Sequence, residues 1–502
     1  MICSTIRDII VQAEKRFQGE DAIRYKVGKD TVEAKSYSQL KQDSESFSRI
    51  LQELGEKGGH IAITGMTSYY WIVAYLGTVN SGSVAVPLDV SLPSDELCEL
   101  LDRSDAAVFV YDEVRKDVAE MVREKCPKVK YLISMQKEKS DESAFSMQEL
   151  LVKHEGTFEC EIEPDSLCTI LFTSGTTGKS KGVMLTQRNL AENATCLDMK
   201  IPERTVILSV LPIHHAYCLS MDILKGLSLG SIICINDSLL RVAKNIHLFE
   251  PNMILMVPLM IETMAKKLED ASKLPAFIVK KKVFGKQFHT ICSGGAYLNP
   301  DYIDLFERYG ITILQGYGMT ECAPVISTNL DWNRKKGSVG KLMPNCEAKV
   351  EDGELLVRGS SVMMGYYQME KETAETLRDG WLATGDLGYV DEDDFVFLTG
   401  RKKNLIITKN GENVSPEELE NKLGENRLIQ EVLVRENEGV IEAEIFPDYE
   451  YAAKKKIKDI PAKLQELIDS YNQGAPAYKK IYRLKVRETE FEKTPSKKIK
   501  RF

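Results

Sequence analysis

Residues 173–182 read T-S-G-T-T-G-K-S-K-G and follow directly on an apolar run, Leu167 to Phe172. Glycines let backbone N–H groups turn inward on anionic oxygens, hydroxyls add neutral donors, and a lysine adds positive charge. The spacing differs from a Walker loop, because two residues separate Gly175 from Gly178 where that motif has four. The stretch therefore predicts a strand followed by a polyphosphate site, with a plain Gly/Ser/Thr loop as the alternative.

Further segments continue this pattern in order along the chain. They are G-Y-G-M-T-E at 316–321, G-W-L-A-T-G-D at 380–386, G-R-K-K-N at 400–404, K-N-G-E-N at 409–413, and K-T-P-S-K-K-I-K-R at 493–501. Together with residues 77–89 and 211–215, they resemble the adenylate-forming superfamily of acyl-CoA synthetases, peptide-synthetase adenylation domains and luciferases. The chain looks most like the bacterial fatty-acyl-CoA ligases. The resemblance covers nearly the whole chain and rests on the joint order and spacing of the segments.

The alternation of apolar and amphipathic segments predicts an α/β fold with layered, largely parallel sheets. Residues 37–54 have the pattern of an amphipathic helix. Short strands and glycine turns over about residues 325–400, with a hairpin pattern at 389–397, predict a small β-rich subdomain. The other strand-like runs are 61–63, 107–111, 131–133, 205–211, 232–235, 311–314 and 354–358.

A chain of 502 residues is too long for one ordinary core, so we expect two or more domains. The N-terminal AMP-binding domain is expected at 1–400 and includes the β-rich subdomain, and a small mobile α+β C-terminal domain is expected at 401–502. Ser415, Pro416 and Glu418 predict the start of a helix with a capping box shortly after this boundary.

Composition excludes several classes of protein. Apolar residues make up 43% and charged residues 28% of the chain, which excludes wholesale disorder. The chain has 66 basic and 75 acidic residues, so its overall charge does not indicate binding to nucleic acid. The eleven cysteines are scattered without a C-x-x-C pair, which indicates reduced thiols rather than a zinc ribbon. The N-terminus is charged too early for a secretory signal, and the apolar runs fall short of the ~20 residues of a membrane helix. We expect a cytoplasmic protein without an integral membrane segment.

The resemblance implies a site for ATP and Mg²⁺. Thr320 and the first loop would hold phosphate oxygens, and Glu321 matches the glutamate that holds Mg²⁺, a hard cation that prefers oxygen ligands. Ser180 stands where the family usually has proline. The implied phosphate-binding set is Thr173, Ser174, Gly175, Thr176, Thr177, Gly178 and Lys181.

The nucleoside would be held by separate segments. Tyr317 has the planar face needed to cover an adenine, and the small residues Gly294, Gly295 and Ala296 resemble the wall on its other side. Asp386 would accept hydrogen bonds from the ribose, and Arg401 would donate to the same sugar. The alternatives are a core aromatic residue for Tyr317 and a simple turn for Asp386.

A pair of histidines, His214 and His215, follows a strand-like run. Adjacent residues on a strand point to opposite faces, so chelation of one metal by both is not expected. His215 resembles the family's gate beside the substrate carboxylate, with a structural histidine as the alternative. No acidic residue stands beside His215 in the sequence to pair with a substrate ammonium, which favours a fatty acid over an amino acid.

The resemblance also assigns roles near the C-terminus. Lys498 matches the catalytic lysine that bridges the substrate carboxylate and the α-phosphate. Lys497 replaces the usual glycine before it, and the register of Ile499 and Arg501 favours Lys498. Lys403 matches the hinge about which the small domain rotates after adenylation. The rotation would bring a loop with Gly411 and Glu412 over the active site to form the channel for the thiol.

The implied reaction is the ATP-dependent activation of a carboxylic acid to an acyl-adenylate with release of pyrophosphate, followed by thioester formation with CoA. A medium- or long-chain fatty acid is the first choice of substrate, and an aryl or other bulky carboxylate is the second. Two further alternatives stay open: a ligase that loads the phosphopantetheine of an acyl carrier protein, and a nonenzymatic nucleotide-binding module. The presence of Lys498, Glu321 and Asp386 argues against the latter.

Overall fold

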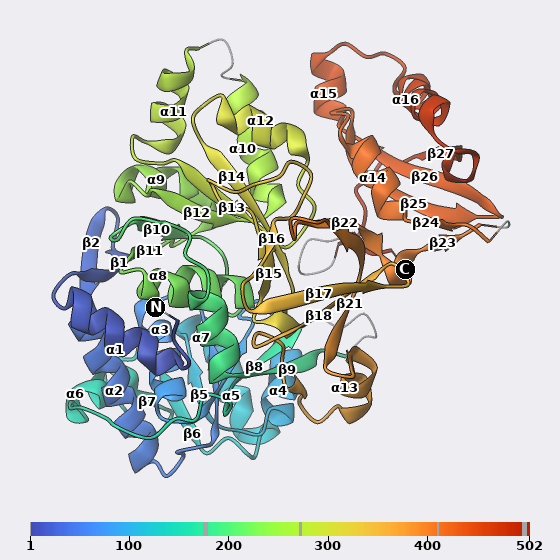
Figure 1. Ribbon diagram of the computed structural model, residues 1–502. Helices are drawn as coiled ribbons and strands as arrows, with labels where there is room; N and C mark the ends of the chain where they lie inside the picture. The colour runs from blue at the N-terminus through green and yellow to red at the C-terminus, as the bar shows by residue number, and fades with distance from the viewer. Residues whose placement is uncertain (1, 174–178, 271–273, 409–410, 494–498, 502) are drawn as a thin grey trace.

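The computed structural model describes residues 2–173, 179–270, 274–408, 411–493 and 499–501. Ser174, Gly175, Thr176, Thr177, Gly178, Lys497 and Lys498 therefore lie outside the described residues. Over the described ranges, one sheet of eight strands and one of nine strands lie in two layers, with helices between them and on their outer faces (Figure 1). A β-rich part and a C-terminal α+β part follow, which confirms the predicted fold class.

The eight-stranded sheet has the order β19-β9-β8-β4-β3-β5-β6-β7 and is parallel from β8 to β7. The predicted strands at 61–63, 107–111, 131–133 and 167–172 are confirmed here. Helices α4, Ser94–Arg103, and α5, Lys116–Lys125, bury their apolar faces against this sheet. Its strands are β3 His60–Thr64, β4 Val84–Leu88, β5 Ala106–Tyr111, β6 Tyr131–Ser134, β7 Phe145–Ser146, β8 Leu167–Thr173, β9 Lys181–Thr186 and β19 Gly365–Tyr366.

The nine-stranded sheet has the order β16-β15-β14-β13-β12-β10-β11-β1-β2 and is parallel from β14 to β1. The predicted strands near 205, 232 and 311 are confirmed as β10, β11 and β14. Figure 1 shows helices α9 to α12 on the side of this sheet away from the eight-stranded sheet: Val242–Phe249, Pro258–Asp270, Ala276–Phe284 and Pro300–Glu307. Its strands are β1 Asp21–Val27, β2 Thr31–Ser36, β10 Val206–Ser209, β11 Ile232–Ile235, β12 Met253–Met256, β13 Thr290–Ser293, β14 Thr312–Gly318, β15 Val325–Thr328 and β16 Lys341–Leu342.

The helices between the two layers form the main core. Helix α3, Tyr69–Asn80, is apolar on all sides and almost completely buried, as expected for a helix enclosed by other elements. The predicted helix at 37–54 is confirmed as α2, Tyr37–Glu53. The neighbouring helices are α1 Ile6–Phe17, α6 Met147–Lys153, α7 Gln187–Thr195 and α8 Lys225–Ser228, the last preceded by a π-helical segment, Cys218–Leu224.

The crossing of α2 and α3 depends on Gly77. A Cβ atom at Gly77 would lie 2.6 Å from Phe47 Cβ and 2.7 Å from the Ser44 carbonyl oxygen. Ser48 Oγ donates a hydrogen bond to the Gly77 carbonyl at 2.7 Å, which fixes the two helices in this close approach. Any side chain at residue 77 must therefore push the helices apart.

The β-rich part is a five-stranded antiparallel sheet, with β22 beside β21. It consists of β17 Cys346–Glu351, β18 Glu354–Gly359, β20 Leu377–Arg378, β21 Trp381–Val390 and β22 Val396–Arg401, and α13, Glu370–Thr376, lies beside it. The predicted strand at 354–358 and the predicted hairpin at 389–397 are confirmed. Strands β15 and β16, which lie within the range predicted for the subdomain, extend the nine-stranded sheet.

The C-terminal part has its own apolar core around a three-stranded sheet. Helix α14, Pro416–Gly424, begins after Ser415 as predicted, but the predicted capping box is wrong, because the Ser415 hydroxyl bonds Glu417 at 3.1 Å instead of a backbone N–H. The other elements are β23 Ile406–Ile407, β24 Asn413–Val414, β25 Ile429–Asn437, β26 Val440–Pro447, β27 Ile481–Val486, α15 Tyr449–Lys454 and α16 Ile460–Gly474.

Few polar contacts in the described ranges join the C-terminal part to the rest. Lys266 of α10 pairs with Asp448 at 3.3 Å, and Glu269 of the same helix pairs with Arg427. Figure 1 shows the C-terminal part beside α10 and α12, with β22 leading into it. No described helix is long and apolar enough to cross a bilayer.

Replacing Gly77 with alanine should lower the free energy of unfolding by about 1–3 kcal/mol, the usual cost of overpacking a core. Denaturant-induced unfolding followed by circular dichroism measures the change. The matched control is Gly19→Ala, because a Cβ at Gly19 meets no atom within 4 Å. Equal stability of the two variants would contradict the close approach of α2 and α3.

Candidate active site

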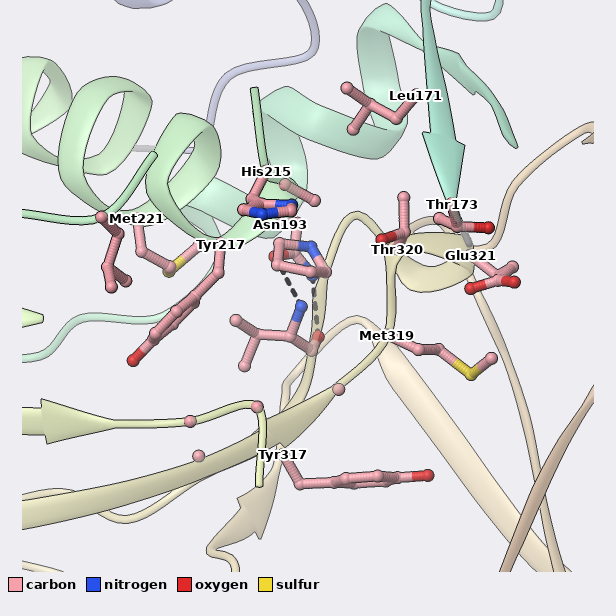
Figure 2. A pocket seen from close by; sticks show the side chains of 18 of the residues that line it. Leu171, Thr173, Asn193, His215, Tyr217, Met221, Tyr317, Met319, Thr320 and Glu321 are labelled. Carbon is pink, nitrogen blue, oxygen red and sulfur yellow. Dashed lines mark hydrogen bonds between the residues drawn. The ribbon is translucent and has the colours of Figure 1, made fainter. Parts of the chain in front are cut away.

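A cavity of about 1140 Å³ lies where the two layers meet the β-rich part. Figure 2 shows Thr173, Thr320 and Glu321 together on one side of it, and Tyr217 and Met221 on the other. One end of the lining is polar and glycine-rich. The remainder is mostly apolar, with Leu197, Met199, Ile201, Ile207, Leu211, Met221, Leu229, Met253, Leu255, Val257 and Met260 among its residues.

The ends of β8 and β9 bring the first predicted motif to the cavity. Thr173 and Lys181 are paired across the two antiparallel strands, and both line the cavity. The Lys181 ammonium lies over the ring of Tyr366, 4.7 Å from its centroid, a cation–π contact that fixes the direction of the side chain.

Thr320 and Glu321 occupy a tight turn after β14. This turn requires a glycine at residue 318, because a Cβ there would lie 1.9 Å from the Pro324 carbonyl oxygen. Both Thr320 and Glu321 line the cavity, and Glu321 Oε1 accepts a hydrogen bond from the Tyr366 hydroxyl at 2.8 Å. Burial, followed by the Glu321 charge, raises the pKa of Tyr366, so the phenol stays protonated as a donor.

Tyr317, Asp386 and Arg401 form one contact chain between β14, β21 and β22. The Tyr317 hydroxyl donates to Asp386 Oδ2 at 2.7 Å, and Arg401 Nε lies 2.7 Å from Asp386 Oδ1. Burial and then the Asp386 charge raise the pKa of Tyr317. Tyr317 and Arg401 line the cavity, whereas Asp386 lies directly behind them, buried to 6% exposure.

The small residues after β13 differ in position. Gly294 and Gly295 line the cavity, and a Cβ at Gly294 would lie 3.3 Å from the ring of Tyr217. Ala296 is exposed and is not among the lining residues. The structure therefore brings two of the three predicted wall residues to the cavity.

The expectation that His214 and His215 point to opposite faces is wrong. They lie in a turn rather than on a strand, and their ring centroids are 4.3 Å apart. Both line the cavity, and His214 Nε2 lies 3.5 Å from Asp89 Oδ1, an acidic partner that is distant in sequence. Burial lowers the pKa of His214 to about 4, with the neighbouring His215 acting in the same direction. Burial also lowers the pKa of His215, so both imidazoles are neutral at pH 7.

Two polar residues at the site were missed by sequence reasoning. The Asn193 amide of α7 donates to the Val325 carbonyl and to Ser361 Oγ, each at 2.8 Å, and its oxygen accepts from the Val325 N–H at 3.2 Å. The sequence did offer one sign of this role, since an asparagine on the buried face of a helix needs hydrogen-bond partners.

The buried Glu354 of β18 is the second. Its Oε1 accepts from the Gly385 N–H at 3.0 Å, and its Oε2 pairs with Lys402 at 2.7 Å. It thereby joins the turn before Asp386 to Lys402, the neighbour of the predicted hinge residue Lys403. The sequence held no signal for this role, because its partners lie 31 and 48 positions away.

The residues predicted near the C-terminus are only partly brought together. Lys403 lines the cavity, next to Lys402. Gly411 has a positive φ of 80°, and Gly411 and Glu412 are exposed on the C-terminal part and do not line the cavity. In the described ranges, no cluster of three or more His, Cys, Asp or Glu side chains suits a metal ion held by protein ligands alone. The arrangement suits a ligand with an anionic end and an apolar end.

Comparison with known structures supports this reading of the fold. An o-succinylbenzoate CoA synthetase from Bacillus subtilis, solved with its acyl-adenylate intermediate, is 26% identical with a TM-score of 0.78, over 98% of this chain and 96% of that one. The anthranilate CoA ligase AuaEII, solved with anthranoyl-AMP, has a TM-score of 0.84 at 21% identity, over 99% and 95% of the two chains, which shows a shared fold.

Sequence comparison adds a curated relative and two family models. The long-chain-fatty-acid–CoA ligase of Salmonella typhimurium is 28% identical over 456 residues, which cover 80% of this chain and 78% of that protein. The model for AMP-binding enzymes matches residues 11–367, and the model for the C-terminal domain of AMP-binding enzymes matches residues 403–502. The chain therefore belongs to the AMP-binding enzyme family, the adenylate-forming group that includes the acyl-CoA ligases.

Proposed function

We propose that this acyl-CoA ligase activates a medium- or long-chain fatty acid, with ATP and Mg²⁺, and transfers the acyl group to CoA. The observation that carries the proposal is that the glycine-rich polar end of the cavity continues directly into an apolar end. A ligand pocket commonly measures about 300–1,000 Å³, so about 1140 Å³ leaves room for a nucleotide and an alkyl chain together. The name of the Salmonella relative supports a fatty acid as substrate.

The polar end supports binding of a triphosphate. Thr173 and Lys181 supply a hydroxyl and a charge where the described strands end. The remaining predicted donors, Ser174, Gly175, Thr176, Thr177 and Gly178, stand between them in the sequence. Glu321 fits Mg²⁺, because one carboxylate together with phosphate oxygens and water matches the small number of protein ligands that this ion takes. When bound, Mg²⁺ supplies charge neutralisation of the triphosphate.

The nucleoside would lie between Tyr317 on one side and Gly294 and Gly295 on the other, as the lining supports. The role of Asp386 as ribose acceptor requires that its present bonds to Tyr317 and Arg401 be shared with the sugar hydroxyls, which a carboxylate with several lone-pair sites permits. Arg401 would donate to the same sugar. Ala296 follows these glycines in the sequence but does not line the cavity, so we assign it no contact with the nucleoside.

Adenylation requires attack of a carboxylate oxygen on the α-phosphorus and loss of pyrophosphate. Charge then builds on the phosphoryl oxygens, and fixed donors stabilise it. We assign this stabilisation to Thr320 and Lys498. The neutral His215 at the junction of the two ends would donate an N–H to the substrate carboxylate without adding a charge that competes with Lys498.

Thioester formation then requires that Lys498 withdraw and the thiol enter. We assign the hinge to Lys403, at the start of the C-terminal domain, 401–502, and the thiol channel to the loop with Gly411 and Glu412. The ion pairs that Lys266 and Glu269 make with the C-terminal part must break in such a rotation. Ion pairs of this exposed kind contribute about 0–1 kcal/mol each, so they do not lock the domain.

Two alternatives concern the substrates. The structural neighbours include an anthranilate CoA ligase and an o-succinylbenzoate CoA synthetase, which favours an aryl acid as the second candidate. The thiol of an acyl carrier protein is the alternative to CoA.

The absence of disulfides among the eleven cysteines, all of them in the described ranges, supports a cytoplasmic location.

With ATP and a fatty acid, the enzyme should form AMP and pyrophosphate in a Mg²⁺-dependent reaction. Glu321→Gln should raise the Mg²⁺ concentration needed for half-maximal rate, because it removes the anionic ligand charge. A coupled pyrophosphate assay over a Mg²⁺ series measures this. The exposed Glu392→Gln serves as the matched control. ADP and orthophosphate as products would contradict the proposed reaction.

Lys403→Pro should spare acyl-adenylate formation and suppress thioester formation, because proline fixes φ near about −65° and obstructs rotation at the hinge. The two half-reactions are measured separately, by pyrophosphate release and by acyl-CoA formation from preformed acyl-adenylate. Lys403→Ala keeps the backbone free and is the control. Equal losses in both half-reactions would argue against a hinge at Lys403.

Lys498→Ala should slow acyl-adenylate formation about 10²–10³-fold, the scale for loss of one preorganised charge-stabilising group. The same variant should still convert preformed acyl-adenylate and CoA to acyl-CoA at nearly the wild-type rate. Lys497→Ala should have a much smaller effect. A larger loss in the Lys497 variant would show that the register of the catalytic lysine is wrong.

A further inference from the structure

A lysine lines the apolar part of the cavity. Lys225 begins α8, is only 6% exposed, and lies among cavity residues that include Leu197 and Leu229. Its ammonium donates one hydrogen bond, to the Leu197 carbonyl at 2.5 Å. An alkyl chain alone gives no reason for a cation at this place.

Lys225 is far from the reacting end of the substrate. His215, at the polar junction, immediately precedes a continuous helical stretch that runs through the π-helical segment into α8. Ten positions along a helix, from 215 to 225, correspond to a separation on the order of 10–15 Å. A substrate whose carboxylate lies at His215 would therefore reach Lys225 with the opposite end of its chain.

Within the described ranges, no carboxylate forms an ion pair with Lys225. The nearby groups whose charge favours its protonated form are Cys196 and then the exposed Asp198. Burial lowers the pKa of Lys225 to about 8. A buried cation with one hydrogen bond is costly, and the cost falls when an anion joins it. An acyl chain that ends in a methyl group offers no anion, so it would not reduce the cost of burying this ammonium.

We infer that the acid substrate carries a second carboxylate at the far end of an apolar chain, and that Lys225 binds this carboxylate. The inference rests on the proposed function, since it assumes that the cavity holds an acyl chain. It assigns Lys225 to specificity for α,ω-dicarboxylic acids over monocarboxylic acids of the same length. The apolar lining between His215 and Lys225 suits the methylene chain of such an acid.

The first experiment needs no variant. Pyrophosphate release is measured for α,ω-dicarboxylic acids of increasing chain length, for their monomethyl esters, and for the matching monocarboxylic acids. At the best length, the diacid should exceed the ester in kcat/KM by about tenfold or more, the scale of one hydrogen bond to a charged group. An equal or lower kcat/KM for the diacid at every length overturns the inference.

The second experiment replaces the cation. Lys225→Met should lower kcat/KM for the diacid and raise it for the monocarboxylic acid, which reverses the preference. Lys225→Gln keeps a donor for the Leu197 carbonyl, so it separates loss of charge from loss of folding and should also abolish the preference. Lys116→Met, at an exposed lysine, is the control and should change neither value.

The outcomes separate the two proposals. Activation of monocarboxylic acids, with a diacid preference that is absent or insensitive to both Lys225 variants, overturns the inference and leaves the proposed function intact. Failure of the wild-type enzyme to activate any acid in the panel overturns both. A diacid preference that both variants abolish supports the inference.

Discussion

The carboxamide of Asn193 connects the two layers at the point where the site is built. Asn193 lies at the centre of the view in Figure 2. Its amide bonds the backbone of Val325 from both its nitrogen and its oxygen, and it donates to Ser361 in the segment that leads to β19. The helix between the layers thereby determines where the turn after β14 lies. Thr320 and Glu321 project from that turn, so their position depends on the hydrogen bonds of this buried amide.

The site combines neutral imidazoles with a carboxylate and a phenol in close contact. Burial keeps the His214 and His215 rings uncharged, and the same burial keeps the Tyr317 phenol protonated beside Asp386. These groups therefore present dipoles and N–H or O–H donors rather than net positive charge. Positive charge near this part of the cavity comes instead from lining residues such as Lys181, Arg401 and Lys402.

The layered fold could be predicted because buried parallel strands read as continuous apolar runs, as residues 167–172 and 232–235 do. The motifs at 316–321 and 380–386 could be placed together because the family resemblance orders them. Glu354 and Asn193 could not be found, since their function depends on partners brought near only by the tertiary fold. The prediction that His214 and His215 point to opposite faces was wrong for a local reason. Side chains alternate between faces on a strand, and His214 lies in a turn.

The topology of the nine-stranded sheet affects how the chain folds during synthesis. Ile23 of β1 pairs with Ile233 of β11, which is 210 positions later (233 − 23). At about 5–20 residues per second, translation separates the two strands by roughly 10–40 s. Until β11 emerges, the β1–β2 hairpin carries an unpaired edge that invites pairing with other chains. The N-terminal hairpin is therefore exposed to such pairing throughout this interval of synthesis.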